Sequence, residues 1–226
     1  ASRQSGNLAG RIRLGVLPSI GPYLLPPATR QLHAEHPDLR LVVREARTID
    51  LGKDLEDGRA DTVISTAEDH TQATSTTLFE EGFWVCAAHD DPILQGSGDV
   101  NITDLSGRPL LALGYGHRLT LAIEALASAA GAFVSSEYEG TSLDAVRQMA
   151  ETGAGIAILP SLYAISEARR DPGIKLRRIN HPIARRQISL VWRATSPLAD
   201  MMLTLAASLR QAAAQILADE PRIRNS

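Results

Sequence analysis

The segment LALGYGHRLTLAIEALASAAGA, residues 111–132, places a short cationic turn directly before an apolar stretch of small residues. The turn ends in His117 and Arg118. A guanidinium at the start of a helix can bind a carboxylate or a phosphate, because it donates paired hydrogen bonds beside the exposed N–H groups of the first turn. The same arginine could instead pair with one of the 26 acidic residues of the chain. Anion binding and an internal ion pair therefore both remain open for Arg118.

His117 offers a second kind of chemistry, metal binding, but a histidine in a turn is more often packed than coordinating. No second His or Cys lies at metal-binding spacing from it, so we expect no metal. The nucleophile elbow, the Walker A loop, the dinucleotide-binding fingerprint and the zinc-protease motif are all missing from the sequence. We therefore predict a binding protein without cofactors rather than an enzyme.

The charge and composition exclude several other classes of protein. A net charge of −3 and a pI near 6.1 argue against a surface that itself binds nucleic acid, because phosphate binding needs a basic patch. The single cysteine, Cys86, allows no internal disulfide, which suits a reducing compartment. No apolar run is long enough to cross a bilayer, and residues 1–10 lack the apolar part of a signal peptide. We expect a cytoplasmic protein without membrane contact.

Strands and helices alternate through the first third of the chain. Residues 11–19 and 39–46 alternate polar with apolar side chains, and residues 60–65 form a short apolar run, which predicts three strands. Apolar spacing predicts a helix over residues 25–36 and a second one that begins at Thr48 as its N-cap. This order is typical of an α/β unit with parallel strands.

A second α/β unit follows, with helices predicted over residues 118–130 and from Thr141, whose side chain is expected to form a capping box with Asp144. The chain is thus predicted to be an α/β protein of two Rossmann-like subdomains, hinged by crossover segments near residues 84–88 and 193. A ligand is expected in the crevice at the strand ends. The predicted division is a linker remnant at 1–10, subdomain I at 11–84 and 194–218, and subdomain II at 85–193.

Several segments, in order, resemble the effector-binding domain of LysR-type transcriptional regulators. They are RIRLGVLPSIGPYLLPPATRQLHAEHPDLRLVVREA, LEDGRADTVI, DLSGRPLLAL, TSLDAVRQMAETGAGIAILP and LVWRATSPL, and they span about residues 8–217. The resemblance implies a periplasmic-binding-protein type II-like fold with a small-molecule effector between the lobes. It also implies a winged helix-turn-helix domain, absent from this chain, through which the full-length protein would contact DNA.

The resemblance further implies a homodimer of regulatory domains and a homotetramer of the full-length protein. Residues 24–45 of one copy would pack antiparallel against residues 118–138 of the other. The phrases GPYLLP, GHRL and TSLDAVRQM are most similar to the OxyR branch of peroxide regulators. In that branch a cysteine follows the Gly-His pair and a second one lies nine residues later.

An ungapped alignment puts Arg118 and Ala127 at these two positions, so the resemblance does not extend to the redox switch. Arginine is a permanent cation and cannot form a thiolate. Cys86 lies in an apolar strand segment without a partner thiol, which favours a buried structural cysteine. Oxidation of Cys86 remains the alternative.

Matching the family's pocket positions residue by residue gives the candidate effector-binding side chains. They are Ser19, Thr48, Thr66, His117, Arg118, Thr141, Ser142 and Arg193. Each hydroxyl could instead serve only in a cap or a turn, and Arg193 could brace the hinge.

We therefore expect the effector-sensing domain of a LysR-type regulator, in which a small anion between the lobes shifts their angle. A solute-binding protein of a transport system is the alternative, because it would share the two-lobed architecture.

Overall fold

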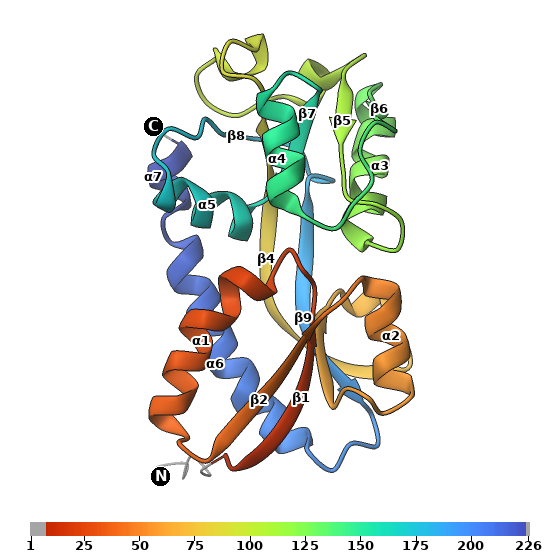
Figure 1. Ribbon diagram of the computed structural model, residues 1–226, viewed down its shortest axis with the longest axis vertical. Helices are drawn as coiled ribbons and strands as arrows, with labels where there is room; N and C mark the ends of the chain where they lie inside the picture. The colour runs from red at the N-terminus through yellow and green to blue at the C-terminus, as the bar shows by residue number, and fades with distance from the viewer. Residues whose placement is uncertain (1–7, 225–226) are drawn as a thin grey trace.

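The computed structural model describes residues 8–224 and shows two lobes connected by two long strands (Figure 1). The strands follow the order β2-β1-β3-β9-β4-β7-β5-β6, and β8 pairs with β4. Lobe I contains β1 to β3, β9 and the first part of β4, whereas lobe II contains β5 to β8 and the end of β4.

Lobe I is built on three parallel strands followed by two strands, each of which runs antiparallel to the strand before it in the sheet. The parallel strands are β1 (Gly10–Val16), β2 (Leu39–Glu45) and β3 (Thr62–Ser65), and the antiparallel ones are β9 (Arg185–Arg193) and β4 (Ala73–Cys86). Helices α1 (Gly21–Glu35) and α6 (Ala199–Leu217) cover one face of this sheet, and α2 (Thr48–Glu56) covers the other. Pro22 is tolerated in α1 because its first turn needs no N–H donor there.

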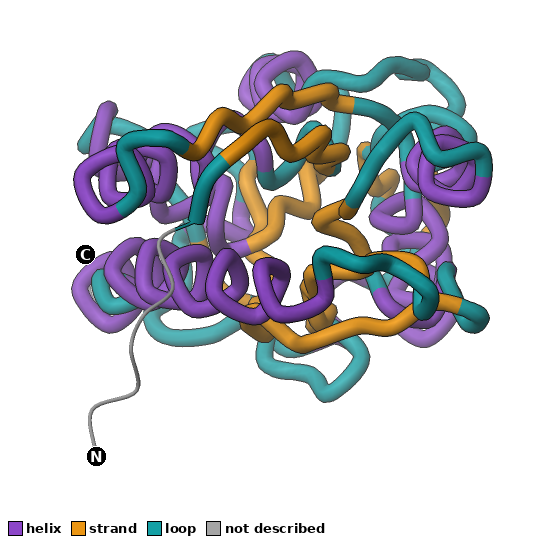
Figure 2. Tube along the Cα trace, turned by 90° about the horizontal axis from the view of Figure 1, so that it is seen from below, coloured by secondary structure: helices purple, strands orange, loops and turns teal. Residues whose placement is uncertain are grey.

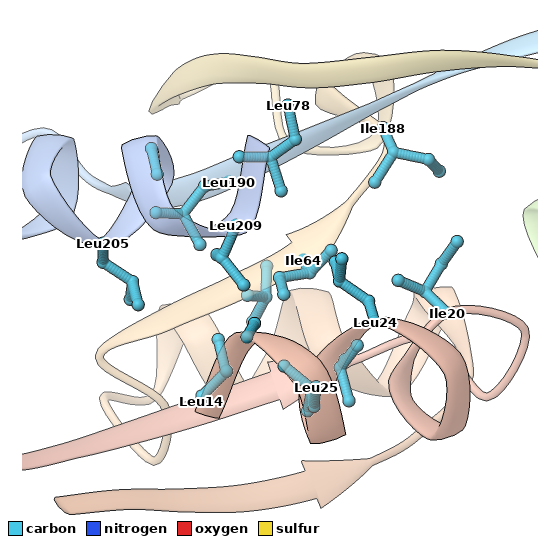
Figure 3. Packing of buried hydrophobic residues seen from close by; sticks show 14 of the residues in the cluster. Leu14, Ile20, Leu24, Leu25, Ile64, Leu78, Ile188, Leu190, Leu205 and Leu209 are labelled. Carbon is cyan, nitrogen blue, oxygen red and sulfur yellow. The ribbon is translucent and has the colours of Figure 1, made fainter. Parts of the chain in front are cut away.

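The core of lobe I lies between the sheet and helices α1 and α6. Figure 3 shows Leu14 and Ile64 of the sheet close to Leu24 of α1, with Leu209 of α6 completing the contact. Seen along the long axis, helices enclose the strands on several sides (Figure 2). Burial of this apolar surface supplies the main driving force for folding of the lobe.

Lobe II repeats the arrangement with shorter strands. Its parallel strands are β5 (Pro109–Leu111), β6 (Phe133–Val134) and β7 (Ile156–Pro160), and β8 (Arg177–Arg178) lies beside β4. Its helices are α3 (Arg118–Ala130), α4 (Leu143–Glu151) and α7 (Glu220–Arg224), and α5 (Ser161–Arg170) contributes buried residues to the cores of both lobes. A separate apolar core, which includes Trp84, Leu110 and Ile158, holds this lobe together.

The chain crosses between the lobes within β4, again just before β9, and a third time between α6 and α7. The last pair of the lobe I ladder is Gly82 with Arg185, and the Phe83 N–H then donates to Ala184 O at 3.0 Å. The predicted crossover near residue 193 is therefore wrong. All of β9 belongs to lobe I, because its apolar side chains, such as Leu190, are buried in that core.

Three smaller sequence predictions also need correction. The predicted linker over residues 1–10 extends too far, since Leu8 is buried and β1 begins at Gly10; residues 1–7 lie outside the described residues. Thr48 is the first residue of α2 and not its N-cap. Helix α4 is capped by Ser142, whose hydroxyl accepts from the Ala145 N–H, rather than by Thr141.

In residues 8–224, no helix is both long and apolar enough to cross a membrane.

Replacing Ser161 by alanine should test the packing beside the crossover. Its buried hydroxyl accepts from Trp84 Nε1 at 2.9 Å and donates to Gly82 O at 3.1 Å. Ser161→Ala leaves the buried indole N–H without a hydrogen-bond acceptor, so the free energy of unfolding should fall by about 1–3 kcal/mol. Urea denaturation followed by tryptophan fluorescence measures this change. The exposed Ser97→Ala is the control, and equal stability of the two variants would contradict the assignment.

Candidate functional site

The carboxyl ends of the parallel strands in the two lobes face each other, and hydrogen bonds join the two lobes directly at this place. The Thr48 hydroxyl of lobe I accepts from the backbone N–H of Arg118, the first residue of α3, at 3.0 Å. The Ile49 N–H donates to Gly116 O at 3.4 Å. Thr48 therefore supplies the helix cap that α3 lacks within its own lobe, because the residue before α3 makes no side-chain cap bond.

An ion-pair cluster joins the lobes at the same place. The Arg118 guanidinium lies 2.7 Å from a Glu68 carboxylate oxygen and 2.9 Å from an Asp69 oxygen. Both acids belong to lobe I, in the 3-10 turn Ala67–Asp69. Of the two alternatives left open for Arg118, the structure shows the internal ion pair. We call the Arg118–Glu68–Asp69 cluster the clasp.

Gly116 permits the close approach of the two lobes. Its φ of +88° is a left-handed conformation that glycine adopts without strain. A Cβ added there would come within 3.0 Å of the Ile49 side chain. The glycine of the GYGHR turn thus allows the turn to rest against α2.

A cavity of about 680 Å³ lies beside the clasp, with walls from both lobes. Lobe I contributes the exposed side of α2 and Asp69, and lobe II contributes the turn before α3, the start of α3 and the segment after β6. Among the sequence-predicted residues, Thr48, His117 and Arg118 line it. The volume lies in the range of small-molecule sites.

His117 is buried in this wall, and its Nε2 atom has no hydrogen-bond partner within the described part of the chain. Burial lowers the pKa of His117, and the nearby Arg47 guanidinium lowers it further. The imidazole is therefore neutral at physiological pH and can accept a hydrogen bond at one ring nitrogen.

A second polar cluster is buried where the strands pass between the lobes. The Arg186 guanidinium lies 2.7 Å from Glu81 and donates to the Ser19 hydroxyl at 2.9 Å. Glu81 also accepts from the Leu162 N–H at 2.7 Å. Arg186 Nη1 is left without a partner among residues 8–224. Ser19 is thus held by the hinge strands.

The remaining candidates do not meet in one place. The hydroxyl of Thr66 is buried and donates to Asp69, so it positions one acid of the clasp. Thr141 and Ser142 are exposed and do not line the cavity, and Ser142 serves as a helix cap. Arg193 donates to Leu55 O at 2.7 Å. It lies at the opposite end of β3 from the gap, because β9 runs antiparallel to β3.

Sequence reasoning missed the acidic half of the site. Glu68 and Asp69 follow a predicted strand, which was a usable signal, but nothing in the sequence pairs them with Arg118. Glu81 and Arg186 occupy buried positions of their strands. A charged residue among buried positions needs a partner, yet the partner lies 105 positions away in the chain.

Comparison with known proteins places this geometry in a family. The model described as the LysR substrate binding domain matches residues 5–214. The chain belongs to this family. The DNA-binding transcriptional dual regulator OxyR of Escherichia coli K12 is 35% identical over 211 residues, which cover 93% of this chain and 68% of that protein.

Solved OxyR structures share the fold of this LysR-family chain. A hydrogen-peroxide-bound cysteine-to-serine mutant of Corynebacterium glutamicum OxyR has a TM-score of 0.83 and 27% identity, covering 94% of this chain and 67% of that one. The reduced OxyR regulatory domain from Pseudomonas aeruginosa has a TM-score of 0.76 and 28% identity, covering 91% and 97%. The predicted family, its OxyR branch and the periplasmic-binding-protein type II-like fold are confirmed.

This chain is thus the effector-sensing regulatory domain of a LysR-type transcriptional regulator. These relatives are transcription regulators, which gives no support to the transport-protein alternative. They also favour a non-enzymatic role.

Cys86 should resist hydrogen peroxide in the folded domain. Its side chain is 1% exposed, and burial raises the pKa of the thiol to about 12, so almost no thiolate exists at neutral pH. Peptide mass mapping after peroxide treatment should show a free thiol at Cys86 and no disulfide. The same treatment in urea is the positive control. Oxidised Cys86 in the folded sample would contradict this expectation.

Proposed function

We propose that this domain binds a small effector in the cavity between the lobes and that binding changes the angle of the lobes. The observation that carries the proposal is that the cavity is bounded by both lobes and includes the groups that join them. A ligand there contacts Asp69 and Arg118 differently in closed and open states. Only such differential contact can shift an equilibrium between two states.

The change of angle would reach DNA through an N-terminal DNA-binding domain of the full-length regulator, in keeping with the family. The sensing step does not use a thiol at residue 118, since the side chain there is a guanidinium held by two carboxylates. The effector acts through non-covalent contacts with both lobes.

A cavity-filling variant tests the proposal directly. Gly52 lines the cavity, and a Cβ added to it would meet only His70 atoms, at 3.7 and 3.8 Å. Gly52→Trp should therefore fold and occupy the cavity, whereas Gly52→Ala should leave it open. Native mass spectrometry of the three proteins in an extract of the source cells should show a small-molecule adduct that only Gly52→Trp lacks.

The same proteins report on the lobe angle. Spin labels on Thr71→Cys and Ser97→Cys, in a Cys86→Ser background, measure the distance between the lobes. The extract should change this distance in the protein whose cavity is unchanged, and it should not change it in the Gly52→Trp protein. No adduct, or an adduct that Gly52→Trp retains, would overturn the proposal.

We also propose that two copies pair antiparallel through the surfaces of residues 24–45 and 118–138. Strand β2 is at the edge of the sheet and exposes Val43 at 43%, and Phe133 of the opposite edge strand β6 is 54% exposed. Exposed apolar side chains on open strand edges are typical of surfaces that another chain covers. In a dimer with a two-fold axis this contact would form twice, each time between residues 24–45 of one copy and residues 118–138 of the other. Full-length proteins would combine such dimers into a tetramer.

Sedimentation velocity tests this pairing. The unchanged chain should be a dimer, whereas Val43→Lys or Phe133→Lys should be monomeric, because each places two buried charges in the interface. Leu203→Lys alters a side chain that is also exposed, at 51%, but lies on α6 outside both segments. It should remain dimeric. Dimers of all three variants would exclude this interface.

A further inference from the structure

The cavity between the lobes is lined by more acidic than basic side chains. Its carboxylates are those of Glu56, Asp69, Glu124 and Glu139, and its cations are Lys53 and Arg118. Arg118 is already paired with Asp69 and with Glu68 outside the cavity wall. The clasp thus has one negative charge in excess. Together with the other acids, this leaves an unbalanced negative potential in the cavity.

The uncharged part of the lining also suits a cation. Tyr115 is 75% exposed and Tyr138 is partly buried, and both line the cavity. The face of a tyrosine ring attracts an ammonium or guanidinium group. His117 lies in the same wall; it is 4% exposed, and its Nε2 atom is buried without a partner among the described residues. The neutral imidazole adds no positive charge that would repel a cation.

The contacts of Arg118 show that this environment binds a positive charge. Its guanidinium reaches across the gap to the two acids of lobe I, so the protein's own cation lies in the cavity wall. An anion entering there would have to displace two carboxylates from Arg118 and would meet further carboxylates. A second cation would find acids that Arg118 does not neutralise.

We propose that the effector carries a positively charged amine or guanidine group that competes with Arg118 for Asp69. This inference rests on the proposed inter-lobe sensing and adds the chemical class of the ligand. Bound beside Asp69, the ligand's charge repels Arg118, which weakens the clasp and lets the lobes separate. The domain then responds to a small organic cation rather than to an anion.

Calorimetry with putrescine, agmatine and spermidine tests the ligand class, with succinate as the anionic comparison. At least one amine should bind the unchanged domain, and succinate should not. The Glu124→Gln, Glu139→Gln double variant should bind that amine about three- to tenfold more weakly, because it removes two charge contacts. Asp90→Asn, an exposed carboxylate outside the cavity, should bind as the unchanged domain does.

The Arg118→Met variant should change the affinities for an amine and for an anion in opposite directions, and it therefore distinguishes the two ligand classes. Removing the competing internal cation should tighten amine binding by about two- to fivefold, whereas an anionic effector would bind more weakly. Tighter succinate binding than amine binding, or no binding of any of the three amines, overturns the proposed class. If the cell extract still gives an adduct that the Gly52→Trp protein lacks, the proposed inter-lobe sensing stands and only the proposed ligand class fails.

Discussion

The ion pair between Arg186 and Glu81 is the interaction on which the arrangement of the two lobes depends. It is buried at the end of lobe I where β4 and β9 meet the crossover segments, and its members also hold Ser19 and the Leu162 N–H in the first turn of α5. Removing either charge would leave the other buried and unpaired, which is strongly destabilising. The pair therefore fixes the two strands relative to each other where the chain leaves lobe I.

The clasp differs from this pair in its exposure and hence in its strength. Arg118 is 34% exposed and Glu68 is 62% exposed, so their contact is worth only about 0.2–1 kcal/mol and is screened by salt. A strong connection at the hinge and a weak one at the mouth of the gap allow the lobe angle to respond to a ligand of ordinary affinity.

An arginine in place of the redox cysteine changes the kind of signal that this position can receive. A disulfide is a covalent bond made or broken by an oxidant or a reductant. The clasp is instead an equilibrium of charges, and it changes with any ligand that alters the charge beside Asp69. The buried thiol of Cys86 offers no replacement, because it lies within the core of lobe II.

The sequence alone determined the α/β class, the two lobes and the family, because strand and helix periodicities and the order of local segments are properties of neighbouring residues. It also determined that no thiol stands at position 118. The tertiary structure decided what Arg118 does, since its partners Glu68 and Asp69 lie some 50 positions away. It likewise moved the second crossover from residue 193 to residues 184–185, because β9 is apolar enough for either lobe and only its pairing with β3 places it in lobe I. Local patterns specify which elements form, whereas the charge of a cavity depends on which distant side chains the fold brings to one wall.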